Sequence, residues 1–448
     1  MSNLTQAIRQ LQEEFSADTP QLHSIAADFR RDMINGLAGR PSSLAMLPSF
    51  LTRPSGQEQG IFLALDFGGT NIRALAVELL GNGSFQIRDR QALPLVDPAG
   101  GYNLIADSAT AEELFGFLAS QLAKLIPSSD IHLLGHTFSF PCRQTSANDA
   151  ILLYWTKEIK TSGVEGRDIV QLLNTALSQQ GLSHIRPVVI LNDTVSALIA
   201  AAYSDIRTDI GSICGTGHNT CYLEPTPPQG TQPMYINLES GNFDKIPGNI
   251  YDIRLDRHSE RPGTGRLEKM CSGRYIGELV RLVILGLMER DLIWGGRVPA
   301  FFAAANILSG EDLALFLSDA TPRLERIAAW LNSRDPAAGH TLADRSLFKT
   351  VASLVVTRSA RLAAVTYTAA LRHMDPDMSQ PHTIAIDGSL YEKMPGYAQT
   401  IHTTLGDLLG EKSGLVRCRL AKDGSGVGAA VAAAICGSFQ SADPAFSG

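Results

Sequence analysis

The sequence has little of what membrane insertion, a disulfide framework or broad nucleic-acid binding requires. No apolar run approaches the ~18 consecutive residues of a membrane span, and the amino terminus lacks the basic-then-apolar order of a signal peptide. The six cysteines are scattered without a C-x-x-C pair, which favours neither disulfides nor a zinc site and indicates a cytoplasmic, reducing location. Lys and Arg number 38 against 45 Asp and Glu, for a formal charge of −7, so we expect no nucleic-acid partner.

What the sequence does contain is apolar surface for large cores. The 448 residues are 44% apolar and 19% charged, which excludes a mainly disordered chain and suits two or three domains. The first fifteen residues place apolar side chains at helical spacing and predict a surface helix that docks on the body. A second helix is predicted from Thr19-Pro20, with Gly36 and Gly39 ending it.

An apolar strand is predicted over 61–66, a glycine turn over 67–71 and a returning strand over 72–79. The turn signal at 81–83 introduces a third strand, so this region predicts an antiparallel meander, which a Rossmann unit does not contain. Helices and strands then alternate. A strand over 187–191 ends at the triplet 192–194, where open α/β sheets place their ligands.

The opening pattern occurs a second time. A strand over 209–214, a glycine turn over 215–219 and a strand over 220–224 repeat it about one domain later, which indicates an old duplication of one α/β module. Helical patterns follow to about residue 374, then a strand over 383–387, and finally 423–436, which predicts a turn leading into a buried helix.

The two glycine turns are candidates for binding phosphates. A strand-to-strand glycine turn exposes successive backbone N–H groups, and glycine lets phosphate oxygens approach them closely. Asp66 would lie at the mouth of the first turn, where a carboxylate can hold a hydrated Mg²⁺ against a polyphosphate. A single turn of this kind is typical of an ordinary hairpin. Two matching turns favour a nucleotide clamp.

Several long segments, in order, resemble the eukaryotic-type hexokinase family (hexokinase/glucokinase). They are LALDFGGTNIRALAVEL (63–79), the long signature LGHTFSFPCRQTSANDAILLYWTKEIKTSGVEGRDIVQLL (134–173), VILNDTVSALIAAAY (189–203), CGTGHNTCYLE (214–224), RLEKMCSGRYIGELVRLVIL (266–285), IDGSLYEK (386–393) and DGSGVGAA (423–430). The resemblance runs from about Ser42 to Cys436 and thins between about 292 and 346. The signature over 134–173 is long enough that a chance match is negligible.

The resemblance implies which residues form the site. The sugar-binding residues would be Ser139, Phe140, Pro141, Thr156, Lys157, Asn192, Asp193, Asn219, Glu239 and Glu268. The ATP-binding residues would be Asp66, Gly68, Gly69, Thr70, Asn71, Arg73, Gly215, Thr216, Gly217, Gly273, Arg274, Gly388, Ser389, Gly424 and Ser425, with Asp66 also holding Mg²⁺ through water. Asp193 is the implied general base for the sugar's terminal hydroxyl, and Lys157 would offset charge that develops there.

Considered alone, each of these residues has an ordinary structural explanation. Asp193 or Thr194 could cap the helix that follows, and Lys157, Glu239 and Glu268 could be solvated surface charges. Only the joint pattern, through the resemblance, favours the functional interpretation. The glycines of DGSGVGAA likewise suggest a dinucleotide fingerprint, but the chain ends soon after them and supplies no βαβ unit, so a phosphate-facing turn or a tightly packed helix start is preferred.

Three residues depart from the family pattern. Ser240 follows Glu239 where the family usually has tryptophan, which could loosen the packing behind that acid. His218 stands where the second turn more often has a small residue, and Val427 replaces a common Lys or Arg.

The resemblance implies two α/β domains of the actin-like ATPase (ribonuclease H-like) type with the active site in the cleft between them. The small domain would be 60–192 with 427–448, and the large domain 1–59 with 193–426. The implied reaction is Mg²⁺- and ATP-dependent phosphorylation of glucose, and also of mannose and fructose, at the 6-hydroxyl, the first step of glycolysis, by a monomer or homodimer. One alternative is a catalytically silent sugar sensor, which would have damage at the base or the phosphate loops. A structural or chaperone ATPase of the same superfold would lack the sugar signature.

Overall fold

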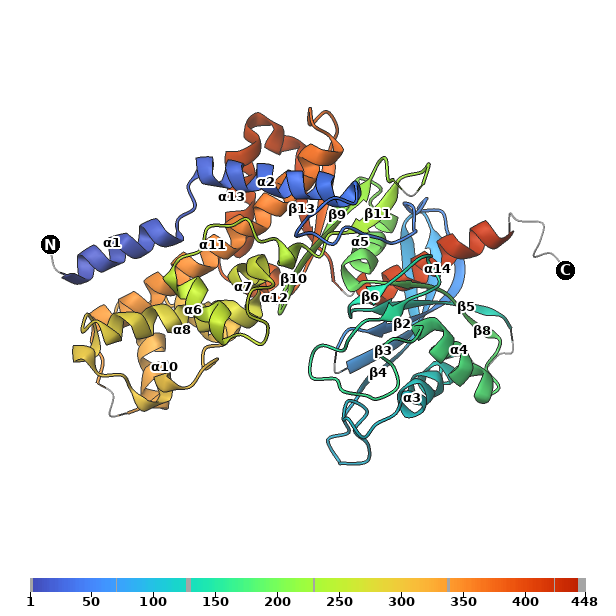
Figure 1. Ribbon diagram of the computed structural model, residues 1–448, viewed down its shortest axis with the longest axis horizontal. Helices are drawn as coiled ribbons and strands as arrows, with labels where there is room; N and C mark the ends of the chain where they lie inside the picture. Colours follow the sequence, from blue (N-terminus) through green and yellow to red (C-terminus); the bar gives the residue numbers. More distant parts are fainter. Residues whose placement is uncertain are drawn as a thin grey trace.

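The computed structural model describes residues 3–69, 71–125, 130–228, 230–336, 339–422 and 424–441. Two β-sheets organise the chain, each in its own lobe (Figure 1). The strands of the first sheet are β2 (Gln59–Phe67), β3 (Asn71–Gly81), β4 (Ser84–Pro94), β5 (His132–Phe138) and β8 (Ile185–Leu191). Their order is β4-β3-β2-β5-β8, with β2, β3 and β4 antiparallel and β5 and β8 parallel to β2. The predicted meander is therefore confirmed.

The second sheet repeats this topology. Its strands are β1 (Leu47–Pro48), β9 (Thr208–Cys214), β10 (His218–Glu224), β11 (Met234–Asn237), β12 (His382–Asp387) and β13 (Val416–Leu420). They lie in the order β1-β11-β10-β9-β12-β13, with β9, β10 and β11 antiparallel and β12 and β13 parallel to β9. Apart from β1, the two sheets share one strand order, which supports the predicted duplication. The third and fifth strands of this copy, β11 and β13, were not predicted.

Helices α5 (Asp193–Ser204) and α14 (Gly424–Ser441) pack on each other between the sheets. Small residues let α14 approach its neighbours closely. A Cβ at Gly428 would lie 1.8 Å from the carbonyl oxygen of Ser196 on α5, and a Cβ at Gly135 of β5 would lie 1.9 Å from the carbonyl oxygen of Ala429. The glycines near the carboxyl end of the chain therefore serve close packing. The chain is already helical at Gly424, so of the two possibilities predicted for this segment the tightly packed helix start is confirmed and the turn is not found among the described residues.

The remaining helices cover the outer faces. In the first lobe these are α3 (Ala111–Ala123) and α4 (Ile169–Gln179), beside the short pair β6 (Cys142–Arg143) and β7 (Ile151–Leu152). The second lobe holds α1 (Asn3–Phe15), α2 (Thr19–Leu37), α6 (Ile250–His258), α7 (Arg266–Cys271), α8 (Gly273–Glu289), α9 (Gly310–Ser318), α10 (Glu325–Arg334), α11 (Leu342–Met374), α12 (Ser389–Lys393) and α13 (Tyr397–Leu409), with 3₁₀ turns η1 (Ser240–Asn242), η2 (Trp294–Gly296), η3 (Ala300–Ala303) and η4 (Gly410–Leu415).

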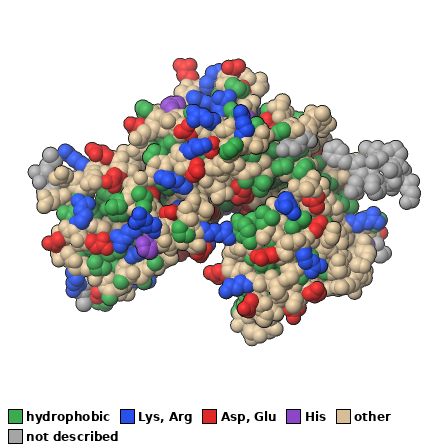
Figure 2. All heavy atoms as spheres, viewed as in Figure 1, with side chains coloured by type: hydrophobic (Ala, Val, Ile, Leu, Met, Phe, Trp, Pro, Cys, Tyr) green, Lys and Arg blue, Asp and Glu red, His purple; other side chains and the backbone are tan. Residues whose placement is uncertain are grey.

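Both predicted amino-terminal helices are present. Helix α1 buries Leu11 and Phe15. Helix α2 begins at Thr19, as predicted, and Asp18 caps it by accepting a hydrogen bond from the backbone N–H of Gln21. Helix α11, at 33 residues, is the central buried helix of the second lobe. No helix among the described residues is long and apolar enough to cross a membrane. The surface is hollowed between the two lobes (Figure 2).

Candidate active site

The first glycine turn follows β2, and Asp66 lies at its start. The Asp66 carboxylate is buried, receives a hydrogen bond from Ser425 Oγ (2.8 Å) and forms an ion pair with Arg73 Nη2 (2.6 Å). Burial raises the pKa of Asp66, and the guanidinium of Arg73 and the hydrogen bond from Ser425 oppose that shift. Asp66, Arg73 and Ser425 are thus brought together from both ends of the chain. Gly68 and Gly69 form the turn, Asn71 is exposed at the start of β3, and Thr70 lies outside the described residues.

Lys157 links the first glycine turn to the loop after β5. Its ammonium donates hydrogen bonds to the carbonyl oxygens of Gly68 and of Ser139 (3.1 Å for the latter) and lies 5.2 Å from the centre of the Phe140 ring. The backbone at Lys157 has φ of 59°, an unusual conformation for a residue that is not glycine. Hydrogen bonds and an unusual backbone conformation therefore hold Lys157 at the glycine turn, whereas a freely solvated lysine would have neither constraint.

The loop carrying Ser139, Phe140 and Pro141 rests on an aromatic cluster. The Phe140 ring packs 4.8 Å from Phe138 and 4.9 Å from Trp155, the latter edge to face. The Ser139 hydroxyl is buried and has no hydrogen-bond partner among the described residues, so it is available to a ligand. Thr156 is half-buried beside Lys157.

Asn192 and Asp193 connect β8 to α5. The side chain of Asn192 caps the helix, accepting from the backbone N–H of Thr194 at 2.9 Å, and Asp193 is the first helical residue. Asp193 Oδ1 accepts from the same N–H at 2.7 Å. Since Asn192 already provides the cap, capping alone does not account for the half-buried Asp193 carboxylate.

A chain of amides in the second lobe orients Glu239. Asn219 Nδ2 donates to Asn237 Oδ1 at 2.9 Å, and Asn237 Nδ2 donates to Glu239 Oε1 at 2.8 Å. Asn219 Oδ1 accepts from the N–H groups of Thr220 (2.7 Å) and Ser240 (3.1 Å), which fixes which end of the amide points to Asn237. Sequence reasoning missed Asn237, which ends β11, a strand too short to give a periodic signal.

Three acidic side chains and Lys157, contributed by both lobes, lie near enough to influence one another's ionisation. Burial raises the pKa of Glu239, the negative charges of Asp193 and Glu268 raise it further, and its hydrogen bond from Asn237 and the charge of Lys157 lower it. Burial likewise raises the pKa of Glu268, against a backbone hydrogen bond from His218 and the charges of Arg274 and Lys157. The three carboxylates therefore share one region, with Lys157 as a nearby cation.

The second glycine turn is held by glycines from two other segments. The Gly215 carbonyl accepts from the N–H of Gly273 at 2.8 Å, and the Thr216 carbonyl accepts from that of Arg274 at 3.1 Å. A Cβ at Gly388 would lie 2.3 Å from the Cys214 carbonyl oxygen, so only glycine permits this approach. The predicted nucleotide residues Gly215, Thr216, Gly217, Gly273, Arg274, Gly388 and Ser389 thus form one cluster. The Arg274 guanidinium is engaged with Glu260.

The three departures are accommodated inside the protein. Ser240 is fully buried and donates its N–H to Asn219, so no loosening is visible behind Glu239, although its hydroxyl has no partner. His218 is buried against Cys214, and burial lowers its pKa to about 4. Val427 faces the apolar cluster between α5 and α14.

The residues present fit a magnesium ion held mainly by a nucleotide. Within the described parts of the chain no three His, Cys, Asp or Glu side chains form a metal-binding group. Asp66 Oδ2 is occupied by Arg73 and Ser425, while Oδ1 lies 3.6 Å from a Cβ built at Gly68 and therefore points to the glycine turn. One carboxylate facing the glycine turn suits a water-mediated contact with Mg²⁺, which keeps most of its water when bound to a polyphosphate.

Comparisons with known proteins agree on one family. Two family models, both described as hexokinase, match residues 7–203 and 209–435. Hexokinase-7 of Oryza sativa subsp. japonica is 37% identical over 96% of this chain and 96% of its own length, and Hexokinase-1 of Schizosaccharomyces pombe is 34% identical over 95% and 90%. A solved hexokinase structure gives a TM-score of 0.86 at 32% identity over 96% of this chain and 99% of its own. The hexokinase from Schistosoma mansoni complexed with glucose gives 0.82 at 30% over 97% and 100%.

Proposed function

Since the chain belongs to the hexokinase family and is therefore a sugar-phosphorylating enzyme, we propose that it transfers the γ-phosphoryl group of ATP to the 6-hydroxyl of glucose. Mannose and fructose are the further acceptors we propose, with the reaction as the first step of glycolysis. The observation that carries the proposal is the convergence of Lys157, Asp193, Glu239 and Glu268 beside two glycine turns.

Asp193 is the proposed general base. A carboxylate at the first position of α5 is oriented by its hydrogen bond from Thr194, and the helix amino terminus stabilises its charge. It would take the proton from the sugar hydroxyl as that oxygen attacks the γ-phosphorus in line with the departing ADP oxygen.

Lys157 is the proposed electrostatic partner of the reaction. Because its ammonium already contacts the carbonyl oxygens of Gly68 and Ser139, it is preorganised where the first turn meets the sugar loop. A cation placed there offsets negative charge on the transferring phosphoryl group without reorganising during the reaction.

Asn219, Glu239 and Glu268 are the proposed sugar-holding groups of the second lobe. Sugar hydroxyls both donate and accept, and carboxylates and amides can pair with two of them at once. Burial raises the pKa of Glu239 and of Glu268, and hydrogen bonds donated by sugar hydroxyls would favour the charged form of both carboxylates.

The two glycine turns are the proposed phosphate-binding segments, one from each lobe. Asp66 would hold Mg²⁺ through water, and the ion would neutralise charge on the phosphates of ATP when bound. Arg73 and Ser425 orient the Asp66 carboxylate for this contact.

The proposal is tested by assaying sugar-phosphate formation from ATP with glucose, mannose, fructose and galactose, together with calorimetric titration of glucose. We expect turnover with the first three sugars and a requirement for Mg²⁺. Glucose binding without turnover would instead establish the silent sensor, and turnover restricted to galactose would refute the proposed specificity.

A further inference from the structure

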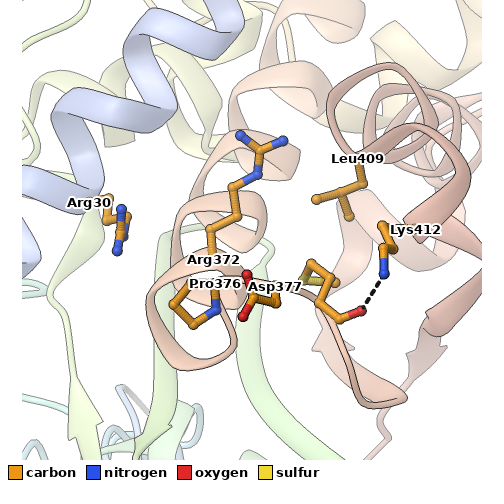
Figure 3. Close-up of a pocket in the computed structure, with 7 residues that line it drawn as sticks. Arg30, Arg372, Pro376, Asp377, Leu409 and Lys412 are labelled. Carbon is orange, nitrogen blue, oxygen red and sulfur yellow. Dashed lines mark hydrogen bonds between the residues drawn. The ribbon is translucent and has the colours of Figure 1, made fainter.

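A cavity of about 330 Å³ lies in the second lobe, apart from the glycine turns (Figure 3). This cavity is partly open to solvent and is lined by α2, the carboxyl ends of α11 and α13, the loop that follows α11, and η4. Its lining includes Arg30, Arg372, Pro376, Asp377, Leu409 and Lys412. Three cationic side chains and one carboxylate thus face a single space.

The cations are not neutralised within the described residues. Arg372 Nη2 donates to the carbonyl oxygen of Leu408 at 2.7 Å, and Lys412 Nζ donates to that of Met378 at 3.3 Å. Arg30 has a buried Nε without any hydrogen-bond partner. Carbonyl oxygens orient the first two side chains but carry no net charge, so the cavity has a formal excess of two positive charges.

Other arginines on these two helices are paired with carboxylates. Arg31, the next residue on α2, pairs with Asp28 of the same helix at 2.7 Å, and Arg361, farther along α11, pairs with Asp407 of α13 at 3.8 Å. Among the described residues no carboxylate pairs with Arg30 or Arg372. Arg30 and Arg372 thus differ from these arginines in lining the cavity without an acidic partner.

The cavity is also separate from the proposed phosphate site. The loop that lines it precedes β12 at its amino end, whereas Gly388 and the second glycine turn lie at the carboxyl end of that strand. A strand rises about 3.3 Å per residue, so the two ends of β12 are on the order of 17 Å apart.

We propose that this cavity is a second binding site, for a small phosphorylated compound. A phosphate monoester carries close to two negative charges at neutral pH, which matches the excess charge of the cavity. Guanidinium groups bind phosphate oxygens in a two-pronged geometry, and Arg30 has unused donors for this contact. Pro376 and Leu409 provide apolar surface for the organic part of the ligand.

The test is titration of the full chain with glycerol 3-phosphate, followed by ³¹P NMR, on the wild type and two single variants. Arg30→Gln removes a cation that has no partner to lose, and Arg31→Gln removes the same charge one residue away, outside the cavity. We expect Arg30→Gln to weaken binding by about tenfold or more, the effect of losing one charge-assisted hydrogen bond. Arg31→Gln should bind glycerol 3-phosphate with the affinity of the wild type. Any binding of this probe in the cleft between the lobes should be the same in both variants, so the difference between them reports binding in the cavity.

Three outcomes would overturn the proposal. The first is absence of binding outside the cleft, seen as complete displacement of the probe by a non-hydrolysable ATP analogue. The second is equal affinity of the two variants. The third is equally tight binding of malonate at matched ionic strength, because a dicarboxylate of the same charge would then satisfy the cavity and phosphate would not be its ligand class.

Discussion

His136 lies in the middle of β5, the strand that leads to the loop over 139–141. Its imidazole is fully buried, and neither ring nitrogen has a hydrogen-bond partner among the described residues. Its strand neighbours are Leu65 and Ile190, and its ring is 5.5 Å from that of Phe138. Burial in these apolar surroundings lowers the pKa of His136 to about 3. We predict that His136→Leu will stabilise the protein and reduce its sensitivity to mild acid.

The sign and size follow from proton linkage. The unfolded chain binds a proton at His136 below its ordinary pKa of about 6.5, while the folded chain binds it only near 3. The stability from the neutral buried ring is therefore complete above pH 6.5 and is lost as pH falls toward the folded pKa. Lowering the pH from 7.5 to 5.5 should cost about 1.4 kcal/mol through this residue. In addition, removing an unpaired buried polar group should gain about 1–3 kcal/mol at neutral pH.

Urea unfolding followed by circular dichroism at pH 7.5 and 5.5 measures both effects. Wild type should lose stability over this interval, and His136→Leu should lose about 1.4 kcal/mol less. His218, whose pKa burial lowers to about 4, should contribute a similar loss that the variant retains. His402→Leu, at an exposed position on α13, is the control and should follow the wild type. If His136→Leu shows the full wild-type loss, the imidazole is hydrated in the folded protein and the reasoning is refuted.

The remaining predictions concern the proposed reaction. Asp193→Ala should lower kcat by about 10²–10⁴-fold with glucose binding retained, and a kcat within threefold of wild type would remove it from the role of base. Glu239→Ala and Glu268→Ala should weaken glucose binding in calorimetry before they affect kcat, because they hold hydroxyls distant from the reacting one; normal affinity would contradict this. Xylose, which lacks the terminal hydroxymethyl group, should raise ATP hydrolysis by closing the cleft with space for water, whereas a high sugar-independent ATPase would contradict closure as the gate.

Much of the fold could be predicted because its strands have strong local signals. The alternation along β2, β3, β9 and β10, broken by glycine turns, indicates the repeated meander directly, and the two-domain actin-like ATPase fold implied by the resemblance is confirmed by the solved hexokinase structures. Strands β11 and β13 were missed because they have only four and five residues, too few to show a clear alternation of apolar and polar side chains. The division into 60–192 with 427–448 and the rest stays a prediction.

The site residues were named by resemblance, and their connections could not be predicted. Asp66 and Ser425 are 359 positions apart, so no local pattern in the sequence relates them. The same holds for Lys157, which reaches Gly68 across 89 positions. These contacts depend on how the two sheets and α14 pack, which is a property of the whole fold.

Helix α5 indicates how the proposed base, Asp193, would stay in place if the two lobes closed on a ligand. On one side a Cβ at Gly424 of α14 would lie 3.0 Å from Cα of Ala197, and on the other a Cβ at Gly211 of β9 would lie 2.6 Å from Cβ of Leu198. The helix is thus packed tightly against both lobes, and Asp193 is its first residue. A rotation of either lobe about this shared element would move the glycine turns and the sugar-holding acids much more than the base. Closure would therefore bring the other groups to Asp193, so variants that perturb closure should change the assembly of the phosphate site while leaving the orientation of the base intact.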